Sequence, residues 1–322
     1  MTRRVLVTGA SGFVGRALVT DLQRAGVDVT AASRSPLAAE FAARLVRTGD
    51  LGPSTDWQPA LRGCDVVVHC AARVHIMADR ATDPLAEFRR ANVEGSVRLA
   101  TQASLAGVRR FIFISSIKVN GDATTPGQPF TERSARKPAD PYGISKSEAE
   151  VRLCELASSG AFELVIIRPP LVYGPGVKAN FLAMAQWLAR GMPLPLGRVT
   201  MNRRSLVALD NLNDLIMTCM NHPAARDQIF LAGDGDDLST AELLRRTAAA
   251  LGTTARLIPV PVALLQAGAA MIGRRDLWQR LSGTLQCSID HARTTLGWVP
   301  PMSVDAGLRR AVAGLASPRS AG

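Results

Sequence analysis

The sequence predicts an α/β fold in which helices cover both faces of a parallel sheet, followed by a smaller second domain. Three observations predict it. Short apolar strands alternate with helical stretches through about residue 172, a glycine-rich turn joins the first strand to the first helix, and proline and glycine break the pattern after residue 173. We expect residues 1–172 to form the sheet domain, with roughly 204–231 returning to it, and 173–322 to form most of a discontinuous substrate domain.

The first strand is predicted at residues 3–7, RRVLV, and it leads directly into the turn TGASGFVG at residues 8–15. Apolar residues then recur at helical spacing until Gly26, where a second strand begins at residues 27–32. Strand, helix and strand make one βαβ unit. Further strands are expected at 66–70, 111–114 and 164–167.

The three glycines of the first turn have separate tasks in such a unit. Gly9 allows the tight turn, Gly12 lets the backbone approach a pyrophosphate, and Gly15 lets helix and strand pack closely. The helix amino terminus faces the phosphates with free N–H groups and a partial positive charge. This context favours a dinucleotide-binding, Rossmann-type domain over a glycine-rich turn with no ligand. The turn residues expected at the cofactor are Gly9, Ser11, Gly12, Phe13, Val14 and Gly15.

The end of the second strand bears on which dinucleotide binds. An acidic residue there would accept hydrogen bonds from the 2′-hydroxyl of NAD, but this chain has Ser33 and Arg34. Because a guanidinium suits a 2′-phosphate, NADP(H) is favoured, with NAD(H) as the alternative. In that alternative Arg34 stacks on adenine or is solvated.

Tyr142 and Lys146 are four residues apart and would lie on one face of a helix. A tyrosine normally titrates near pH ~10, but one adjacent positive charge can lower its pKa by roughly 1–3 pH units, and an oxidised nicotinamide adds a second positive charge. We therefore expect Tyr142 to act as an acid or base near neutrality. The alternative is a chance Tyr-x-x-x-Lys.

Composition excludes several classes of protein. The net charge is +11, but the basic residues are scattered and only 5% of residues are aromatic, so a solvated basic surface is favoured over nucleic-acid binding. Five cysteines without a C-x-x-C pair, and the absence of a secretory leader, predict a reducing cytoplasm and no metal site. The four histidines have no metal spacing, and His69 is expected to pack under the cofactor.

Residues 257–273 form the longest uncharged stretch. They are too few for a membrane-spanning helix, which needs ~20 apolar residues, so we expect no stable membrane insertion. A buried helix behind a proline turn is the favoured interpretation. The alternative is an apolar helix that lies at a membrane interface.

The motifs occur in the order typical of one enzyme family. Gly9-x-x-Gly12-x-x-Gly15, VVVHCAA at residues 66–72, Ser115-Ser116 and Tyr142-x-x-x-Lys146 resemble extended short-chain dehydrogenases/reductases over nearly the whole chain. Within them the chain resembles the NAD-dependent epimerase/dehydratase family and enzymes related to UDP-galactose 4-epimerase. The phrases RPPLVYGPGVKANF and RSLVALDNLNDLI are similar to reductases that convert UDP-4-keto-6-deoxy-N-acetylhexosamines to quinovosamine-type sugars for surface polysaccharides.

The resemblance implies roles for individual residues. Ser116, rather than Ser115, would donate a hydrogen bond to the sugar oxygen, while Tyr142 transfers the proton and Lys146 holds the nicotinamide ribose. Asp50 matches the family's adenine-contacting acid, with a turn residue as the alternative. The complete cofactor set comprises the turn residues above together with Ser33, Arg34, Asp50, Leu51, Cys70, Ala71, Ala72, Tyr142 and Lys146.

The substrate set is less strongly indicated. Asn180, Arg204 and Arg280 match positions that hold the nucleotide-sugar diphosphate, although each arginine could instead be a surface residue. Arg73 and His75 follow the third strand of the sheet domain and are expected to line the sugar pocket.

The chain also departs from the family. Asn120 replaces a tyrosine that is common in the family, so that side of the pocket is expected to differ from the family's. Ile117 and Lys118 stand where related dehydratases carry two acids, so dehydration is disfavoured.

Three functions follow as hypotheses. In the first, NADPH reduces the carbon 4 ketone of a UDP-sugar. In the second, tightly bound NAD supports 4-epimerisation through the same proton path. A non-catalytic dinucleotide sensor is the third and most remote hypothesis.

The resemblance also implies a homodimer formed by helices around residues 84–106 and 142–156.

Overall fold

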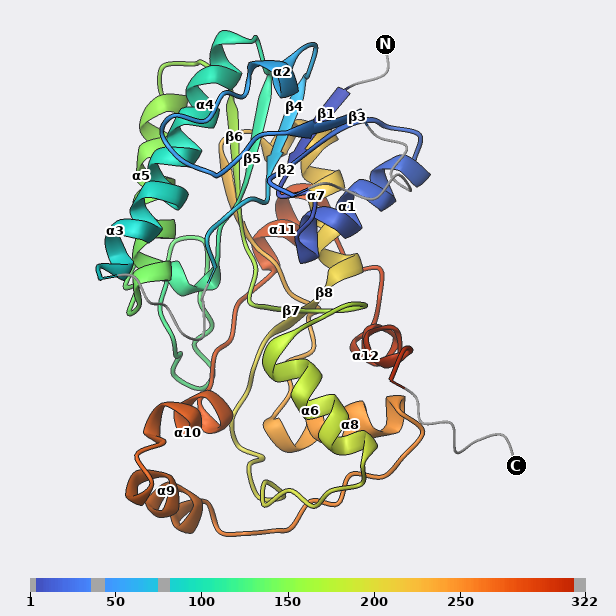
Figure 1. The fold of residues 1–322 in the computed structure, drawn as a ribbon. Coiled ribbons are helices and arrows are strands. Elements are labelled where there is room, and N and C mark those ends of the chain that lie inside the picture. Colours follow the sequence, from blue (N-terminus) through green and yellow to red (C-terminus); the bar gives the residue numbers. More distant parts are fainter. Residues whose placement is uncertain (1–3, 36–43, 75–81, 316–322) are drawn as a thin grey trace.

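The computed structural model describes residues 4–35, 44–74 and 82–315, and within them a parallel sheet is the central feature (Figure 1). Its seven strands are ordered β3-β2-β1-β4-β5-β6-β9. The strands are β1 (Arg4–Thr8), β2 (Asp28–Ser33), β3 (Arg44–Arg47), β4 (Val66–His69), β5 (Arg110–Ile114), β6 (Glu163–Arg168) and β9 (Gln228–Leu231). The predicted doubly wound, Rossmann-type sheet is confirmed.

Helices cover both faces of this sheet (Figure 1). Side chains alternate along each strand, so Val5 and Val7 join one core cluster while Leu6, between them, joins the other. The first cluster includes α1 (Phe13–Arg24), α7 (Leu209–Asn221) and α11 (Asp290–Leu296). The second includes α2 (Gln58–Leu61), α4 (Gly95–Leu105) and α5 (Pro141–Ala157), and α3 (Pro84–Phe88) contacts α5.

A third core cluster lies beyond the carboxyl edge of the sheet, around the pair β7 (Leu171–Tyr173) and β8 (Leu206–Ala208) (Figure 1). Its helices are α6 (Ala179–Ala189), α8 (Thr240–Ala250) and α12 (Val304–Val312). This separate core supports the division that we propose near residue 172. However, α11 and Trp298 pack on the sheet cluster despite their position late in the chain.

One predicted helix differs from the structure. The stretch 257–273 contains α9 (Val262–Met271), which was expected to be buried but has no buried residue. Its sequence is apolar on all sides, and such a pattern does not show which neighbours will cover the helix. No helix in the described part of the chain has the length and hydrophobicity to cross a bilayer.

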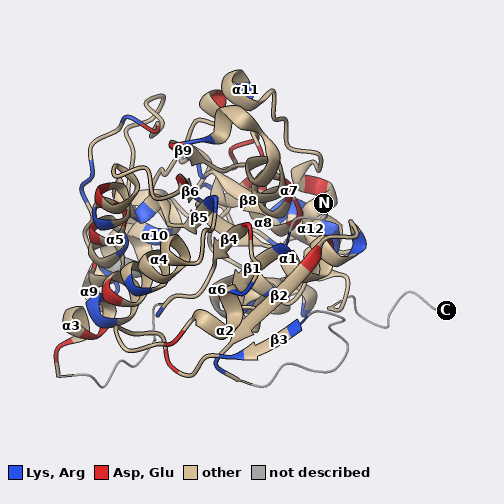
Figure 2. Cartoon of the chain, turned by 90° about the horizontal axis from the view of Figure 1, so that it is seen from above, with Lys and Arg blue, Asp and Glu red and all other residues tan. Residues whose placement is uncertain are grey.

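Charge is spread over the molecule rather than gathered. Figure 2 shows lysine and arginine on many helices and strands, interspersed with acidic residues.

The helices expected to form a dimer interface carry the exposed side chains Leu105 and Val151. The homodimer stays a prediction.

A buried ion pair fixes α5 against the sheet. The Glu150 carboxylate on α5 accepts two hydrogen bonds from the Arg168 guanidinium at the end of β6, from Nε at 2.9 Å and from Nη2 at 2.5 Å. Both side chains are fully buried. Ser115 Oγ donates to the same carboxylate at 2.6 Å, and Arg136 Nε approaches it at 3.3 Å. Helix α5 is therefore tied to the carboxyl ends of β5 and β6.

A second buried network passes through His69. Its Nδ1 lies 2.7 Å from Thr8 Oγ1, and its Nε2 lies 2.9 Å from Ser96 Oγ. Because Ser96 donates its own proton to the Asn92 carbonyl, at 2.6 Å, Nε2 carries the imidazole proton and Nδ1 accepts from Thr8. Burial lowers the pKa of His69 to about 3, so the ring is neutral at neutral pH.

We predict that Arg168→Met lowers the free energy of unfolding by about 3–5 kcal/mol, because it leaves a buried carboxylate without its main partner. Urea denaturation measures the loss. Glu148→Gln is the matched control on the same helix. It breaks the exposed pair with Arg89 and should cost less than about 1 kcal/mol. Equal losses in the two variants would contradict this role of the buried pair.

We also predict that His69 makes the protein sensitive to acid. The unfolded chain binds a proton at this residue below pH ~6.5, whereas the folded protein does not until about pH 3. The free energy of unfolding should therefore fall as pH decreases from 6.5, by up to about 1.4 kcal/mol per pH unit. Urea titrations of wild type and His69→Asn between pH 7 and 5 test this. The variant should lack that part of the slope, and identical slopes would refute the assignment.

Candidate active site

The glycine turn is held by close backbone contacts. Gly9 has φ of 66°, and a Cβ atom there would lie 2.7 Å from the Ala71 backbone nitrogen. A Cβ atom at Gly15 would lie 2.3 Å from the Gly9 carbonyl oxygen. Gly12 is the N-cap of α1 and provides no side-chain cap, so the first N–H groups of the helix face the turn. Ser11 is exposed here, and Phe13 and Val14 are half-buried.

The residues after β4 lie against this turn. The Ala71 N–H donates to Thr8 Oγ1 at 3.2 Å, and its backbone contacts Gly9. Cys70, Ala71 and Ala72 are all partly exposed at this edge. Burial raises the pKa of the Cys70 thiol to about 12, so it stays protonated. Six of the predicted cofactor residues thus share one side of the carboxyl edge with the first turn of α1: Gly9, Ser11, Gly12, Cys70, Ala71 and Ala72.

Arg34 and Asp50 come together at the neighbouring edge. Arg34 Nη1 lies 3.2 Å from Asp50 Oδ1, and both side chains are exposed. Ser33 is buried, and Leu51 lies against the backbone of Gly95 on α4. Asp50 therefore partly neutralises the guanidinium that sequence reasoning assigned to a 2′-phosphate. An exposed pair of this kind is weak and opens at little cost.

Ser116, Tyr142 and Lys146 converge at the end of β5. Ser116 follows the strand and begins a short 3₁₀ helix, and its hydroxyl is hydrogen-bonded to the Tyr142 phenol in the first turn of α5. Lys146 Nζ, one turn further along, donates to the Ile114 carbonyl at 2.8 Å and lies 4.4 Å from the Phe113 ring centroid. Ser115 turns instead to Glu150, which agrees with the choice of Ser116 as the site hydroxyl.

The pKa of Tyr142 differs from the expectation. Burial, with a smaller contribution from the nearby Asp140 carboxylate, raises it to about 12 despite the opposing effect of the Ser116 hydrogen bond. Burial lowers the pKa of Lys146 to about 8. The predicted lowering of the phenol pKa by Lys146 is therefore wrong, because burial decides the direction of the shift. The phenol keeps its proton at neutral pH.

Lys118 has a structural partner on each side. Its Nζ lies 2.7 Å from Asp122 and 2.7 Å from Asp140, which caps α5 by accepting from the Gly143 N–H. The side chain that replaces an acid of the dehydratases thus supports the helix start that carries Tyr142. Sequence reasoning did not find this role, although an Asp before a Pro and a helical run is an N-cap signal.

Arg73 lies beside the helix that carries Tyr142. Its guanidinium stands 5.5 Å from the Phe88 ring centroid, and that ring meets Tyr142 edge-on at 6.1 Å. The Arg73 N–H donates to Asn92 Oδ1 at 2.7 Å. Asn92 was not identified from the sequence, since nothing in its helical pattern marks it. His75 lies outside the described residues.

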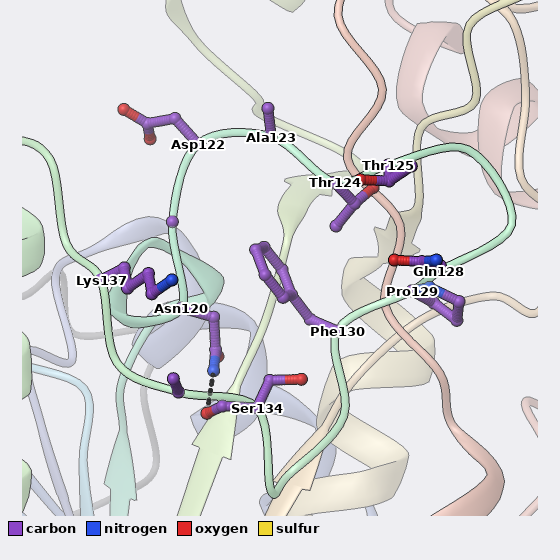
Figure 3. Close-up of a pocket in the computed structure, with 12 residues that line it drawn as sticks. Asn120, Asp122, Ala123, Thr124, Thr125, Gln128, Pro129, Phe130, Ser134 and Lys137 are labelled. Atoms are coloured by element: carbon purple, nitrogen blue, oxygen red, sulfur yellow. Dashed lines mark hydrogen bonds between the residues drawn. The ribbon is translucent and has the colours of Figure 1, made fainter.

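A cavity of about 560 Å³ opens within the loop that follows Ser116 (Figure 3). Its walls come from residues 120–137, and Phe130 stands between the two arms of the loop. Asn120 Nδ2 donates to the Ser134 carbonyl at 3.0 Å, and Asn120 Oδ1 accepts from Arg168. The Phe130 N–H also donates to the Gln286 carbonyl at 2.8 Å. Asn120, which stands where the family commonly has a tyrosine, therefore connects the loop to Arg168 through its hydrogen bonds.

Two of the three candidate diphosphate residues are adjacent. Arg204 Nη1 donates to the Arg280 carbonyl at 2.8 Å, and burial lowers the pKa of Arg204. The Arg280 side chain is exposed on α10 (Arg275–Ser282). Asn180 is exposed in the first turn of α6. No cluster of His, Cys, Asp or Glu suited to a metal occurs in the described ranges.

Comparisons with known proteins agree with this geometry. The sequence model of the NAD dependent epimerase/dehydratase family matches residues 5–233. A Vibrio cholerae protein named UDP-glucose 4-epimerase is 46% identical over 96% of this chain and 94% of its own length. An Agrobacterium tumefaciens short-chain dehydrogenase/reductase superfamily protein with bound NAD has a TM-score of 0.75 at 25% identity, covering 97% of both chains.

A third comparison concerns MoeE5, solved in complex with UDP-glucose and NAD. It has a TM-score of 0.73 at 26% identity and covers 96% of this chain and 97% of its own. The glycine turn, the residues at the end of β5 and the sheet order fit these findings. The chain belongs to the NAD dependent epimerase/dehydratase family, within the extended short-chain dehydrogenases/reductases.

Proposed function

We propose that this enzyme carries out oxidation or reduction at carbon 4 of a UDP-sugar. The observation that carries the proposal is the convergence of the Ser116 hydroxyl, the Tyr142 phenol and the Lys146 ammonium at the end of β5, beside the glycine turn. These groups can bind and protonate a sugar oxygen. The relatives named for UDP-glucose support the choice of sugar nucleotide.

The residues of the turn fit a nicotinamide dinucleotide. Side chains at Gly9 or Gly15 would fill the space that the backbone needs for its close approach, and the uncapped start of α1 offers N–H groups to a pyrophosphate. When bound, the nicotinamide exchanges a hydride with the sugar carbon. NADP(H) is favoured because Arg34 lies at the end of β2, and NAD(H) is the alternative because Asp50 pairs with Arg34.

The proposed substrate side lies across the carboxyl edge. Arg204, Arg280 and Asn180 would hold the diphosphate, since guanidinium groups bond phosphate oxygens in pairs. Arg73 would line the sugar pocket next to Phe88 and Tyr142.

Reduction of a UDP-4-keto-6-deoxy-N-acetylhexosamine is the specific reaction that we favour. In that direction Tyr142 must arrive with its proton and give it to the oxygen at carbon 4 while Ser116 bonds the same oxygen. A phenol whose pKa is raised to about 12 arrives protonated. Lys146 bonds the Ile114 carbonyl at the base of the site and is placed to hold the ribose. The sequence phrases and Arg34 support the same direction.

Epimerisation at carbon 4 is the second candidate, favoured by the name of the Vibrio cholerae relative. It uses the same residues, because the proton path runs forward in one half of the reaction and backward in the other. The two candidates differ in whether the cofactor is consumed.

The deciding experiment measures NADPH oxidation with a UDP-4-keto-6-deoxy-N-acetylhexosamine. We expect turnover in wild type and a loss of about 10²–10⁴-fold in Tyr142→Phe, with nucleotide binding retained by fluorescence titration. Tyr173→Phe is the matched control. It removes the chain's other phenol, whose partner is Asp234 rather than the site, and should keep turnover. Interconversion of UDP-sugars without added cofactor, and no NADPH oxidation, would establish the epimerase instead.

Cofactor preference should respond to the Arg34 and Asp50 pair. Arg34→Ala is expected to raise KM for NADPH about tenfold while leaving KM for NADH nearly unchanged, because only NADPH has a 2′-phosphate. Asp50→Asn should lower KM for NADPH, since it frees the guanidinium from its carboxylate. Steady-state kinetics with both dinucleotides measures the ratio. A preference for NADH in wild type, unaltered by either change, would assign the site to NAD.

A further inference from the structure

Helix α9 is an apolar helix on the surface. None of its residues is buried, and its outer side chains include Leu264 at 64% exposure and Met271 at 82%. Ile272, directly after it, is 74% exposed. Figure 1 shows α9 far from the sheet, at the outer end of the second lobe. An exposed apolar surface of this kind marks a site of interaction with a protein or a membrane.

The helix is nevertheless held in place. Leu257, Leu265 and Trp278 pack against the third core cluster, and α9 contacts α10. One side of the hairpin formed by α9 and α10 therefore faces the fold, and the other presents Leu264, Met271 and Ile272 outward.

The charges around α9 are mostly positive. From residue 252 to residue 280 the sequence contains four arginines and one acidic residue, Asp276. Arg256 precedes the helix, Arg274 and Arg275 follow it, and all three are exposed. Elsewhere on the surface basic and acidic residues are interspersed (Figure 2). An apolar patch flanked mainly by cations is complementary to a layer of anionic headgroups above an apolar interior.

We propose that α9 and its flanking arginines dock this enzyme on an anionic lipid bilayer, parallel to the membrane surface. The outward side chains enter the boundary between headgroups and acyl chains, and the guanidinium groups meet lipid phosphates. At ten residues, α9 lies on the bilayer and does not cross it. A second copy of the chain is a poorer occupant, because a two-fold contact through this face sets arginines against arginines. The proposal does not depend on which sugar the enzyme uses.

Flotation with vesicles tests the proposal on the full-length protein. Wild type should bind vesicles of phosphatidylglycerol and phosphatidylcholine, and bind pure phosphatidylcholine vesicles much less. Arg274→Ser/Arg275→Ser should reduce partition onto the anionic vesicles about 30-fold, because each arginine near such a surface contributes about a fivefold factor. Leu264→Glu/Ile272→Glu should abolish binding to both.

The matched control is Val299→Glu, a change at a 64% exposed apolar side chain outside the α9 surface, which should bind like wild type. Circular dichroism spectra and dinucleotide binding in solution should be the same in all variants, so that lost vesicle binding is not lost folding. Absence of wild-type binding to anionic vesicles would overturn the proposal, as would equal binding by the Leu264→Glu/Ile272→Glu variant. A fall in molar mass in that variant, with no lipid binding by wild type, would overturn it in favour of a second copy.

Discussion

The buried pair of Glu150 and Arg168 is the contact on which the site depends. It joins the middle of α5 to the end of β6, and Ser115 adds the end of β5 to the same carboxylate. Lys146 lies one turn before Glu150 on α5, and its ammonium donates to the last carbonyl of β5. Tyr142 lies one turn before Lys146. Because a buried charge without its partner is costly, this contact allows few alternative positions for the helix. The phenol is thereby held over the sheet edge where the glycine turn also lies.

The glycine turn and the β5 end could be predicted because each depends on local chemistry. Gly9 needs a positive φ and Gly15 needs room for the Gly9 carbonyl, and both demands select glycine directly. The four-residue spacing of Tyr142 and Lys146 fixes their common face whatever covers the helix. The parallel sheet follows from the alternation of strands and helices, and the carboxyl ends of its strands necessarily share one edge.

Contacts between distant segments could not be predicted in this way. Two ion pairs depend on the paths of loops: Arg34 with Asp50, and Lys118 with Asp140. The spacing of apolar residues in the sequence does not predict those paths. The sign of the Tyr142 pKa shift was wrong for the same reason, since burial by surrounding elements decides it. Strand β3 was missed because it is an exposed edge strand without an apolar pattern. The apolar composition of α9 was recognised, but not its exposure.

Helix α10 in the second lobe contacts both the proposed membrane-docking helix and a proposed diphosphate residue. This helix packs against α9 on the outer side, and the carbonyl of its Arg280 accepts from Arg204, a proposed diphosphate ligand, on the inner side. The proposed dinucleotide residues belong instead to the segments that follow β1, β2, β3 and β4 and to the first two turns of α5. A membrane at the proposed docking surface would therefore lie nearer to the proposed diphosphate residues than to the glycine turn. We expect docking to act on substrate binding rather than on Tyr142 and Lys146, because Glu150 and Arg168 hold α5 through a separate contact.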